Sequence, residues 1–288
     1  MILITGANGF VGTHLKQSLD CITVDFNNCD HNGDLKDWNF VQGLPDVDLI
    51  YHLAMINNTS AFYSHPYDII ENSILPQHNI LKRYKGTPII YTSSSETYAG
   101  GFNLNIVPIP TPEEVPLIID DITNPRWSYS ASKILGESMI VAAHTQFDTP
   151  YKIIRYHNIY GPGQKNHFIP EFIDRCLNNE YILHGADATR SFCYIDDAIK
   201  ATLTVADKME WNNIINIGSN DEWVIHDVAK EILNQLNVKT DITIYNSPAG
   251  SVARRKPDIT KLKKLGWQQN ISLPLGISKI LKETYAIN

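Results

Sequence analysis

The first twelve residues constrain the fold of this chain more than any other stretch. A short apolar run, Ile2–Thr5, leads into a turn with three glycines, and a helical pattern of apolar residues begins at Val11. The glycines are Gly6, Gly9 and Gly12. A strand, a tight turn and a helix in this order are typical of a phosphate-binding turn, because glycines let the backbone approach a pyrophosphate. The Gly-x-x-Gly-x-x-Gly spacing differs from the dinucleotide fingerprint Gly-x-Gly-x-x-Gly, and glycines alone also suit an ordinary strand-to-helix turn.

An acidic residue after the next apolar run favours a dinucleotide ligand. Asp25 follows the run Cys21–Val24 and lies nineteen residues after Gly6. The fingerprint expects a carboxylate at this position, where it accepts hydrogen bonds from the adenosine ribose hydroxyls. Because a carboxylate repels a phosphate on that ribose, we expect the cofactor to be NAD rather than NADP.

Strand-like and helical segments alternate along the first 160 residues. This alternation predicts an α/β fold, a Rossmann-like doubly wound parallel sheet. The segment Phe26–Leu44 is too short for a full crossover helix, so we expect that part of the sheet to be abbreviated. The predicted strands are Ile2–Thr5, Cys21–Asp25, Val47–Ala54, Pro88–Tyr91 and Tyr151–Tyr156, and the predicted helices include Tyr67–Lys82 and Ser128–Phe147.

The pattern becomes less regular after Gly161, which indicates a second unit. We expect residues 1–160 to form an NAD-binding domain and residues 161–288 a smaller, interleaved α+β substrate lobe. Strand Ile214–Ile217 is expected to return to the main sheet. Residues Asn105–Pro125 contain five prolines and are predicted to be a long loop, functional or mobile.

Composition limits the function classes. The chain is 43% hydrophobic and 19% charged, its formal net charge is −7, and no apolar run approaches membrane length. These values argue against nucleic acid or an anionic membrane as a partner. The four cysteines have no Cys-x-x-Cys spacing and are expected to be free thiols in a reducing compartment. A strand that begins at Ile2 leaves no room for a signal peptide, so we expect a cytoplasmic protein.

Tyr129 and Lys133 are the strongest candidates for chemistry. They stand four residues apart on a predicted helix and therefore share one face. A lysine ammonium lowers the pKa of a neighbouring phenol, as a base that deprotonates an alcohol requires. An isolated pair of this kind could also lie on a solvated helix face. Ser94, at the carboxyl end of a predicted strand, could hold the same alcohol.

Together these features resemble the extended short-chain dehydrogenase/reductase superfamily, in particular its nucleotide-sugar epimerases, dehydratases and decarboxylases. The resemblance rests on the glycine turn, Ser94, the segment Tyr129–Lys133 and the segment Arg155–Pro162, and it covers nearly the whole chain. It implies bound NAD, a nucleoside diphosphate sugar as the substrate and a homodimer.

Residue roles follow from the resemblance position by position. Tyr129 would be the base, Lys133 its electrostatic partner and a ribose contact, and Ser94 the residue that hydrogen-bonds the reacting hydroxyl. Besides the three glycines and Asp25, the implied cofactor contacts are Asn8, Phe10, Val11, Asp34, Leu35, Leu53 and Ala54. The implied substrate contacts are Ser94, Asn158, Arg190 and Arg255. An arginine fork suits a diphosphate, although either arginine could instead be an ordinary surface residue.

Glu96 bears on the reaction type. The triplet Ser94-Ser95-Glu96 is similar to the Thr-Asp-Glu or Thr-Ser-Glu of the dehydratases and decarboxylases, in which the acid acts after oxidation. Ser95 and Glu96 are therefore candidate catalytic residues, with Ser95 in place of the dehydratase aspartate. A loop glutamate that caps a helix is the alternative. The segments Pro125–Trp127 and Arg255–Asp258 resemble the glucuronate decarboxylases.

The predicted activity is redox-neutral epimerisation of a nucleotide sugar by transient oxidation at sugar carbon 4. The alternatives are a 4,6-dehydratase or uronate decarboxylase that uses Glu96, a net 4-dehydrogenase, and a non-catalytic NAD-binding sensor. No metal is expected. His52, His157 and His167 match no ligand spacing and are expected to be core or loop histidines.

Overall fold

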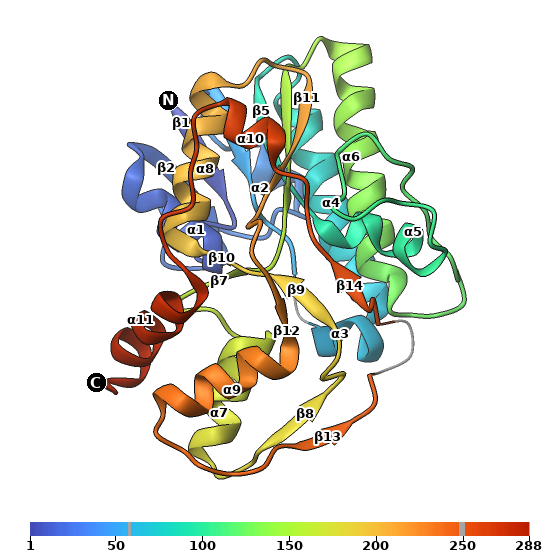
Figure 1. Ribbon diagram of the computed structural model, residues 1–288. Coiled ribbons are helices and arrows are strands. Elements are labelled where there is room, and N and C mark those ends of the chain that lie inside the picture. Colours follow the sequence, from blue (N-terminus) through green and yellow to red (C-terminus); the bar gives the residue numbers. More distant parts are fainter. Residues whose placement is uncertain (57–58, 248–250, 288) are drawn as a thin grey trace.

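The computed structural model describes residues 1–56, 59–247 and 251–287. Its centre is a seven-stranded sheet in the order β11-β6-β5-β4-β1-β2-β3, and every neighbouring pair is parallel (Figure 1). This confirms the predicted fold class. The strands of this sheet are β1 (Ile2–Thr5), β2 (Cys21–Asp25), β3 (His31–Asn32), β4 (Leu49–His52), β5 (Ile89–Ser94), β6 (Tyr151–Tyr156) and β11 (Asn213–Ile217).

Adjacent apolar residues of one strand face opposite sides of the sheet. Leu3 belongs to one hydrophobic cluster and Ile4 to another, and the same division holds for Ile89 and Ile90. Side chains alternate across a strand, so a continuous apolar run is needed where both faces are covered. The runs recognised in the sequence are therefore strands buried on both faces.

Helices cover both faces of the sheet. Helices α1 (Phe10–Leu15) and α8 (Ile195–Lys208) contact each other on one face (Figure 1). On the other face α4 (Pro66–Arg83) packs on α6 (Trp127–Phe147), and α2 (Trp38–Gln42) packs on α4. The two long helices predicted from periodicity are thus confirmed within two residues at each end.

The segment Phe26–Leu44 between β2 and β4 is abbreviated as predicted, since it holds only the two-residue strand β3 and the five-residue helix α2, and the connection from β2 to β3 is short. Only Phe26–Asp30 separate these strands, and no helix lies between them. The pairing is limited to Val24 with His31 and Asp25 with Asn32.

The C-terminal part returns to the main sheet as expected, since β11 pairs with β6 over five residues. Its other strands form three small sheets, β10-β7, β12-β9-β14 and β13-β8. They are β7 (Ile159–Tyr160), β8 (Ile182–His184), β9 (Thr189–Ser191), β10 (Cys193–Tyr194), β12 (Glu222–Val224), β13 (Thr243–Tyr245) and β14 (Arg254–Arg255). The remaining C-terminal helices are α7 (Phe168–Leu177), α9 (Ile225–Gln235), α10 (Thr260–Lys264) and α11 (Leu273–Tyr285).

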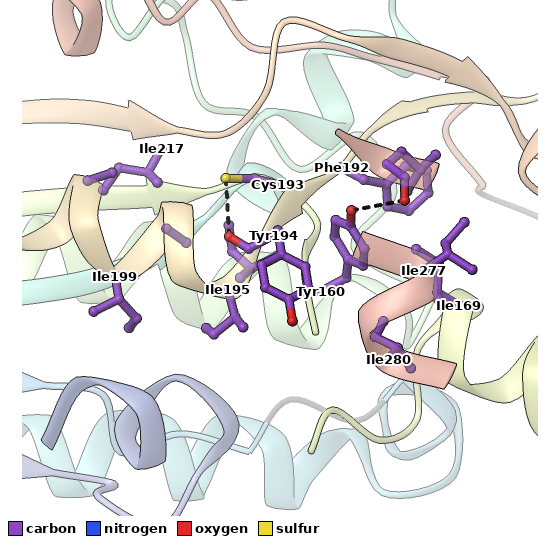
Figure 2. Packing of buried hydrophobic residues seen from close by; sticks show 14 of the residues in the cluster. Tyr160, Ile169, Phe192, Cys193, Tyr194, Ile195, Ile199, Ile217, Ile277 and Ile280 are labelled. Atoms are coloured by element: carbon purple, nitrogen blue, oxygen red, sulfur yellow. Dashed lines mark hydrogen bonds between the residues drawn. The ribbon is translucent and has the colours of Figure 1, made fainter. Parts of the chain in front are cut away.

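One hydrophobic cluster joins these C-terminal elements to the main sheet (Figure 2). Tyr160 lies at its centre, with edge-on ring contacts to Phe192 and Tyr194 at centroid distances of 6.0 and 5.5 Å. Ile277 of α11 and Ile169 of α7 belong to the same cluster. The C-terminal elements therefore share a core with the sheet.

The proline-rich loop is fastened at its middle. Thr111 donates its amide to the carbonyl of Lys256 at 2.9 Å and accepts the amide of Asp258 at 2.8 Å. The short helices α3 (Thr59–Ser64) and α5 (Ala99–Asn103) and the 3₁₀ turns η1 (Lys16–Ser18) and η2 (Ser95–Tyr98) were not expected from periodicity. All four cysteines are free. Among the described residues, no helix has both the length and the apolar character needed to cross a bilayer.

Candidate active site

A cavity of about 690 Å³ lies where the carboxyl ends of β1, β4 and β5 meet the C-terminal elements. Fourteen of the predicted site residues line it. They are Gly6, Gly9, Phe10, Val11, Gly12, Leu53, Ser94, Ser95, Glu96, Tyr129, Lys133, Asn158, Arg190 and Arg255. The remaining five, Asn8, Asp25, Asp34, Leu35 and Ala54, are not part of its lining. Residues that are far apart in the sequence, from Gly6 to Arg255, thus line one cavity.

The backbone of the glycine turn is packed so closely that two of its positions have no space for a side chain. A Cβ on Gly12 would lie 2.2 Å from the carbonyl oxygen of Gly6. Gly6 has φ of +70°, and a Cβ there would lie 2.7 Å from the amide nitrogen of Ala54. The turn is therefore closed against any larger residue at these two positions. This close-approach backbone beside the first turn of α1 fits the pyrophosphate of NAD.

Asp25 is held beside this turn by backbone amides. Its carboxylate accepts the amide of Asn8 at 2.8 Å and the amide of Phe26 at 2.8 Å. The side chain of Asn8 donates to the carbonyl of Asn27 and accepts from Lys16. The end of β2 thus presents a fixed carboxylate next to the glycines, as a ribose contact requires.

Three of the other implied cofactor contacts lie in different settings. Asp34 accepts the amide of Lys36 at 2.9 Å in the turn after β3. Leu35 is buried in the hydrophobic core behind that turn, where its carbonyl accepts from Asn79. Ala54 donates its amide to the Thr5 hydroxyl at 3.4 Å. Their roles toward the cofactor stay predictions.

Tyr129 is buried against an aromatic ring and is not on a solvated helix face. Its ring stacks on Phe62 of α3 with centroids 4.7 Å apart, and the residue is 5% exposed. The expected lowering of the Tyr129 pKa by Lys133 is not found: burial raises the pKa of Tyr129, and a side-chain hydrogen bond with Ser94 opposes that rise. A phenol in this setting stays protonated unless positive charge is brought to it.

Lys133 lies on the same buried face of α6. Its ammonium donates to the carbonyl of Thr92 and is 5.9 Å from the centroid of the Tyr129 ring. Burial lowers the pKa of Lys133 to about 7, and the Glu137 carboxylate acts in the opposite direction. The protonation of Lys133 is therefore sensitive to small changes near neutral pH.

Ser94 is placed by the turn that follows β5. The 3₁₀ turn η2 begins directly after it, and the Ser94 hydroxyl oxygen accepts the amide of Glu96 at 3.2 Å. Because this amide already donates to the oxygen, the hydroxyl hydrogen is free to point toward Tyr129 or a ligand. Ser94 and Tyr129 therefore converge on the same spot.

Glu96 lies among arginines and does not cap a helix. Its carboxylate is 2.8 Å from Arg255 and 3.5 Å from Arg126. Burial alone would raise the pKa of Glu96, but Arg255, Arg126 and more distantly Arg190 lower it to about 2. Ser95 is also a partner of Arg255, at 3.3 Å. Glu96 is thus a carboxylate throughout the neutral range.

The implied substrate contacts are oriented by backbone carbonyls. Arg190 donates to the carbonyls of Thr189 and Val252 at 2.7 and 2.6 Å. Asn158 donates to the carbonyl of Ser191 at 2.9 Å. Neither Arg190 nor Arg255 is an ordinary surface arginine. Arg255 is 4% exposed, and among the described residues its Nε has no hydrogen-bond partner.

Sequence reasoning gave no role in the site to several residues. Phe62 comes from a six-residue helix without a periodic pattern. Arg126 was noted only because its segment resembles the glucuronate decarboxylases, and its ion pair with Glu96 depends on how α6 begins. The buried pair Glu137 and Arg155 was not recognised, because a single sequence gives no sign of such pairing. In the part of the chain that the structure describes, no three His, Cys, Asp or Glu residues are grouped as a metal site.

The chain is similar to a family model and to curated proteins of known activity. The model of the family described as NAD dependent epimerase/dehydratase matches residues 2–218. A UDP-N-acetyl-alpha-D-glucosaminuronate decarboxylase of Bacillus cytotoxicus is 30% identical over 97% of this chain and 96% of its own. A dTDP-D-glucose 4,6-dehydratase of Dictyostelium discoideum is 31% identical over 81% of this chain, which spans 61% of that protein.

The fold is also shared with a solved epimerase. The crystal structure of UDP-glucose 4-epimerase from Thermotoga maritima with UDP-glucose superposes with a TM-score of 0.86. The match covers 99% of this chain and 98% of the other, at 23% identity.

Proposed function

Because the chain belongs to the NAD-dependent epimerase/dehydratase family of enzymes, we propose that it uses NAD to epimerise a nucleoside diphosphate sugar at carbon 4. The observation that supports this reaction is the meeting of Ser94, Tyr129 and Lys133 in one cavity with the glycine turn. These groups serve the oxidation of an alcohol, with which each reaction of such enzymes begins.

When bound, NAD supplies the acceptor, and later the donor, of the hydride. The chain supplies the proton chemistry. The Tyr129 oxygen takes the proton of the sugar hydroxyl and returns it when the ketone is reduced from its other face. Ser94 hydrogen-bonds the same oxygen of the sugar, and Lys133 provides the positive charge that makes the phenolate accessible near neutral pH.

The substrate is expected to bind through the C-terminal part of the chain. We assign residues 1–160 to the cofactor and residues 161–288 to the nucleotide sugar, with Arg190, Arg255 and Asn158 as its contacts. Guanidinium groups suit a diphosphate, because planar donors match its oxygens. The structural relative carrying UDP-glucose supports this substrate class.

We also propose a homodimer through α4 and α6. These helices pack together and expose apolar side chains, including Tyr67, Ile70 and Leu135. Tyr67 is 74% exposed. Apolar side chains at the surface of two packed helices suit a second copy of the same helices.

Decarboxylation of a nucleotide uronate is the second candidate. Three arginines act on the Glu96 carboxylate, so the cluster of Arg126, Arg190, Arg255 and Glu96 has excess positive charge. That excess suits a sugar that carries its own carboxylate in addition to the diphosphate. Loss of carbon dioxide from a 4-keto uronate also needs no proton removal by Glu96, whose pKa of about 2 makes it a weak base.

A substrate panel tests both candidates. UDP, GDP, CDP and dTDP sugars, including UDP-glucose and UDP-glucuronate, are screened for thermal protection, because tight binding raises apparent stability. Chromatography of the products then separates an epimer from a decarboxylated sugar. Tyr129→Phe should lower turnover at least about 100-fold while the protein still binds NAD. Turnover within about tenfold of wild type would contradict the base assignment, and steady growth of reduced-nicotinamide absorbance would indicate a net dehydrogenase.

A further inference from the structure

A fully buried ion pair lies directly behind the catalytic helix face. Glu137 of α6 accepts two hydrogen bonds from Arg155 of β6, at 2.9 and 2.6 Å. The Ser93 hydroxyl of β5 donates to the same carboxylate at 2.5 Å. The side chains of Arg155 and Glu137 are only 3% and 6% exposed. Neither Glu137 nor Arg155 lines the cavity, so neither contacts a ligand there.

Stability alone is a poor explanation for such a pair. Removing two charges from water costs as much as their attraction returns, and apolar residues of similar size often stabilise a core equally well. The pair does fix the orientation of the Glu137 carboxylate. Arg155 also donates to the Tyr98 hydroxyl at 2.7 Å and to the carbonyl of Glu113 at 2.9 Å. With the guanidinium anchored on three sides, the Glu137 carboxylate has one orientation.

Glu137 lies one helical turn after Lys133 on α6. Tyr129, Lys133 and Glu137 follow one another at intervals of four residues and so share one face of α6. Lys133 donates to the carbonyl of Thr92, and Glu137 accepts from the hydroxyl of the next residue, Ser93. The ammonium and the carboxylate are thus anchored to successive residues of one strand.

We infer that Glu137 is a positioning residue of the active site, whose carboxylate keeps the ammonium of Lys133 charged and available to the cofactor. The inference rests on the proposed role of Lys133 as a contact of the NAD ribose. Arg155 and Ser93 contribute by holding the carboxylate in place.

The other groups around Lys133 do not supply this charge. Tyr91 of β5 has its ring centre 5.0 Å from the ammonium, and burial raises the pKa of Tyr91, which keeps the phenol neutral. Burial lowers the pKa of His52 on β4 to about 3, so this imidazole is neutral as well. Tyr129 is a neutral phenol for the same reason as Tyr91. Glu137 is the group that acts against the effect of burial on Lys133.

The test is the pH dependence of NAD binding, which needs no sugar substrate. NAD is titrated calorimetrically between pH 6 and 9 into wild type, Glu137→Gln, Glu137→Asp and Lys133→Met. In wild type the affinity should begin to fall near pH 7, where the ammonium loses its proton. In Glu137→Gln the fall should begin about one pH unit lower, because the Glu137 carboxylate raises the pKa of Lys133 and a neighbouring opposite charge shifts a pKa by about that much or more. Glu137→Asp keeps the charge and should restore the wild-type profile.

A matched buried carboxylate serves as the control. Asp197 is 2% exposed and accepts the amides of Asn270 and Ile271 at 3.0 and 2.8 Å, away from the cavity. Asp197→Asn should lower the melting temperature without moving the pH profile. If Glu137→Gln does not fold, the double variant Glu137→Gln/Arg155→Gln leaves no charge uncompensated and should show the same shift.

Two outcomes distinguish the role of Glu137 from the role of Lys133 on which it rests. A profile in Glu137→Gln that coincides with wild type, while Lys133→Met abolishes the pH dependence, would overturn the inference and leave the role of Lys133 intact. Unchanged affinity and pH dependence in Lys133→Met would instead refute the role of Lys133, and the inference with it.

Discussion

Replacing Gly12 by alanine tests the cofactor cradle most directly. Gly12 lies inside α1, where alanine is normally preferred to glycine by about 0.5–1 kcal/mol. Here a Cβ would lie 2.2 Å from the Gly6 carbonyl oxygen and 2.9 Å from the Cα of Ala7. Ordinary van der Waals contact of a Cβ begins at 3.4 Å, so the turn must open by roughly 1 Å to admit the methyl group. The atoms in the way are backbone atoms, which cannot rotate aside as a flexible side chain would.

The cost of this opening should exceed the gain in helix propensity. Forced rearrangement in a packed region costs about 1–3 kcal/mol. We therefore expect Gly12→Ala to be destabilised by about 1–2 kcal/mol, which lowers the melting temperature by about 2–8 °C in a chain of this size. Since the displaced carbonyl belongs to the pyrophosphate turn, NAD should bind at least about tenfold more weakly, a loss of about 1.4 kcal/mol.

Thermal unfolding and NAD calorimetry measure the two effects, and Gly43→Ala is the matched control. A Cβ on Gly43 would lie 3.5 Å from the Phe40 carbonyl oxygen, an ordinary contact, and its backbone is right-handed. This variant should unfold at or slightly above the wild-type temperature and bind NAD unchanged. If Gly12→Ala matched wild type in both measurements, the steric reasoning about the cradle would be wrong.

Three further predictions concern buried charge. Burial lowers the pKa values of His52 and His157 to about 3, so the unfolded chain takes up these protons first as the pH falls. Each histidine's contribution to the free energy of unfolding should be complete above pH 6.5 and should decline below it by about 1.4 kcal/mol per pH unit. Urea titrations at several pH values measure this slope, and His52→Gln should reduce it. Lys152→Met removes the ammonium that donates to two carbonyls near the end of α8. The free energy of unfolding measured with urea should therefore fall by about 1–3 kcal/mol. An unchanged urea midpoint would contradict this expectation. Glu96→Gln removes the one carboxylate among three arginines, so UDP should bind at least about threefold more tightly by calorimetry, and weaker binding would count against the charge argument.

The sheet and its long helices could be predicted because their signals are local. The strands β1, β2 and β6 each contain a short stretch of apolar residues, and α4 and α6 differ from their predicted bounds by no more than two residues. Short elements carry too few residues for a period to be visible. This is why α3, which supplies the ring stacked on Tyr129, was not expected.

The candidate site was predictable only where spacing encodes geometry. Tyr129 and Lys133 are four apart on a helix, so their common face follows from the helical repeat. Glu137 and Arg155 lie on different elements, and their contact depends on the packing of α6 against β6. Glu113 likewise accepts the amide of Asn216, which comes from a strand more than 100 residues later. A pattern within a single segment does not reveal such contacts.

Lys133 is the residue at which two buried polar chains meet. One begins at Thr5, whose hydroxyl is 2.8 Å from Nδ1 of His52, and the His52 carbonyl accepts the Thr92 hydroxyl at 3.1 Å. The carbonyl of Thr92 then receives the Lys133 ammonium. The other chain is the anchored carboxylate of Glu137. Thr5 ends β1 immediately before the glycine turn, so the backbone that would hold the pyrophosphate and the lysine that would hold the ribose are joined by hydrogen bonds across β1, β4 and β5. Polar groups are costly in a sheet covered on both faces unless they are paired, and Thr5, His52 and Thr92 are paired toward the carboxyl edge, where the cavity opens. The carboxyl edge thus fixes the glycine turn and Lys133 relative to each other.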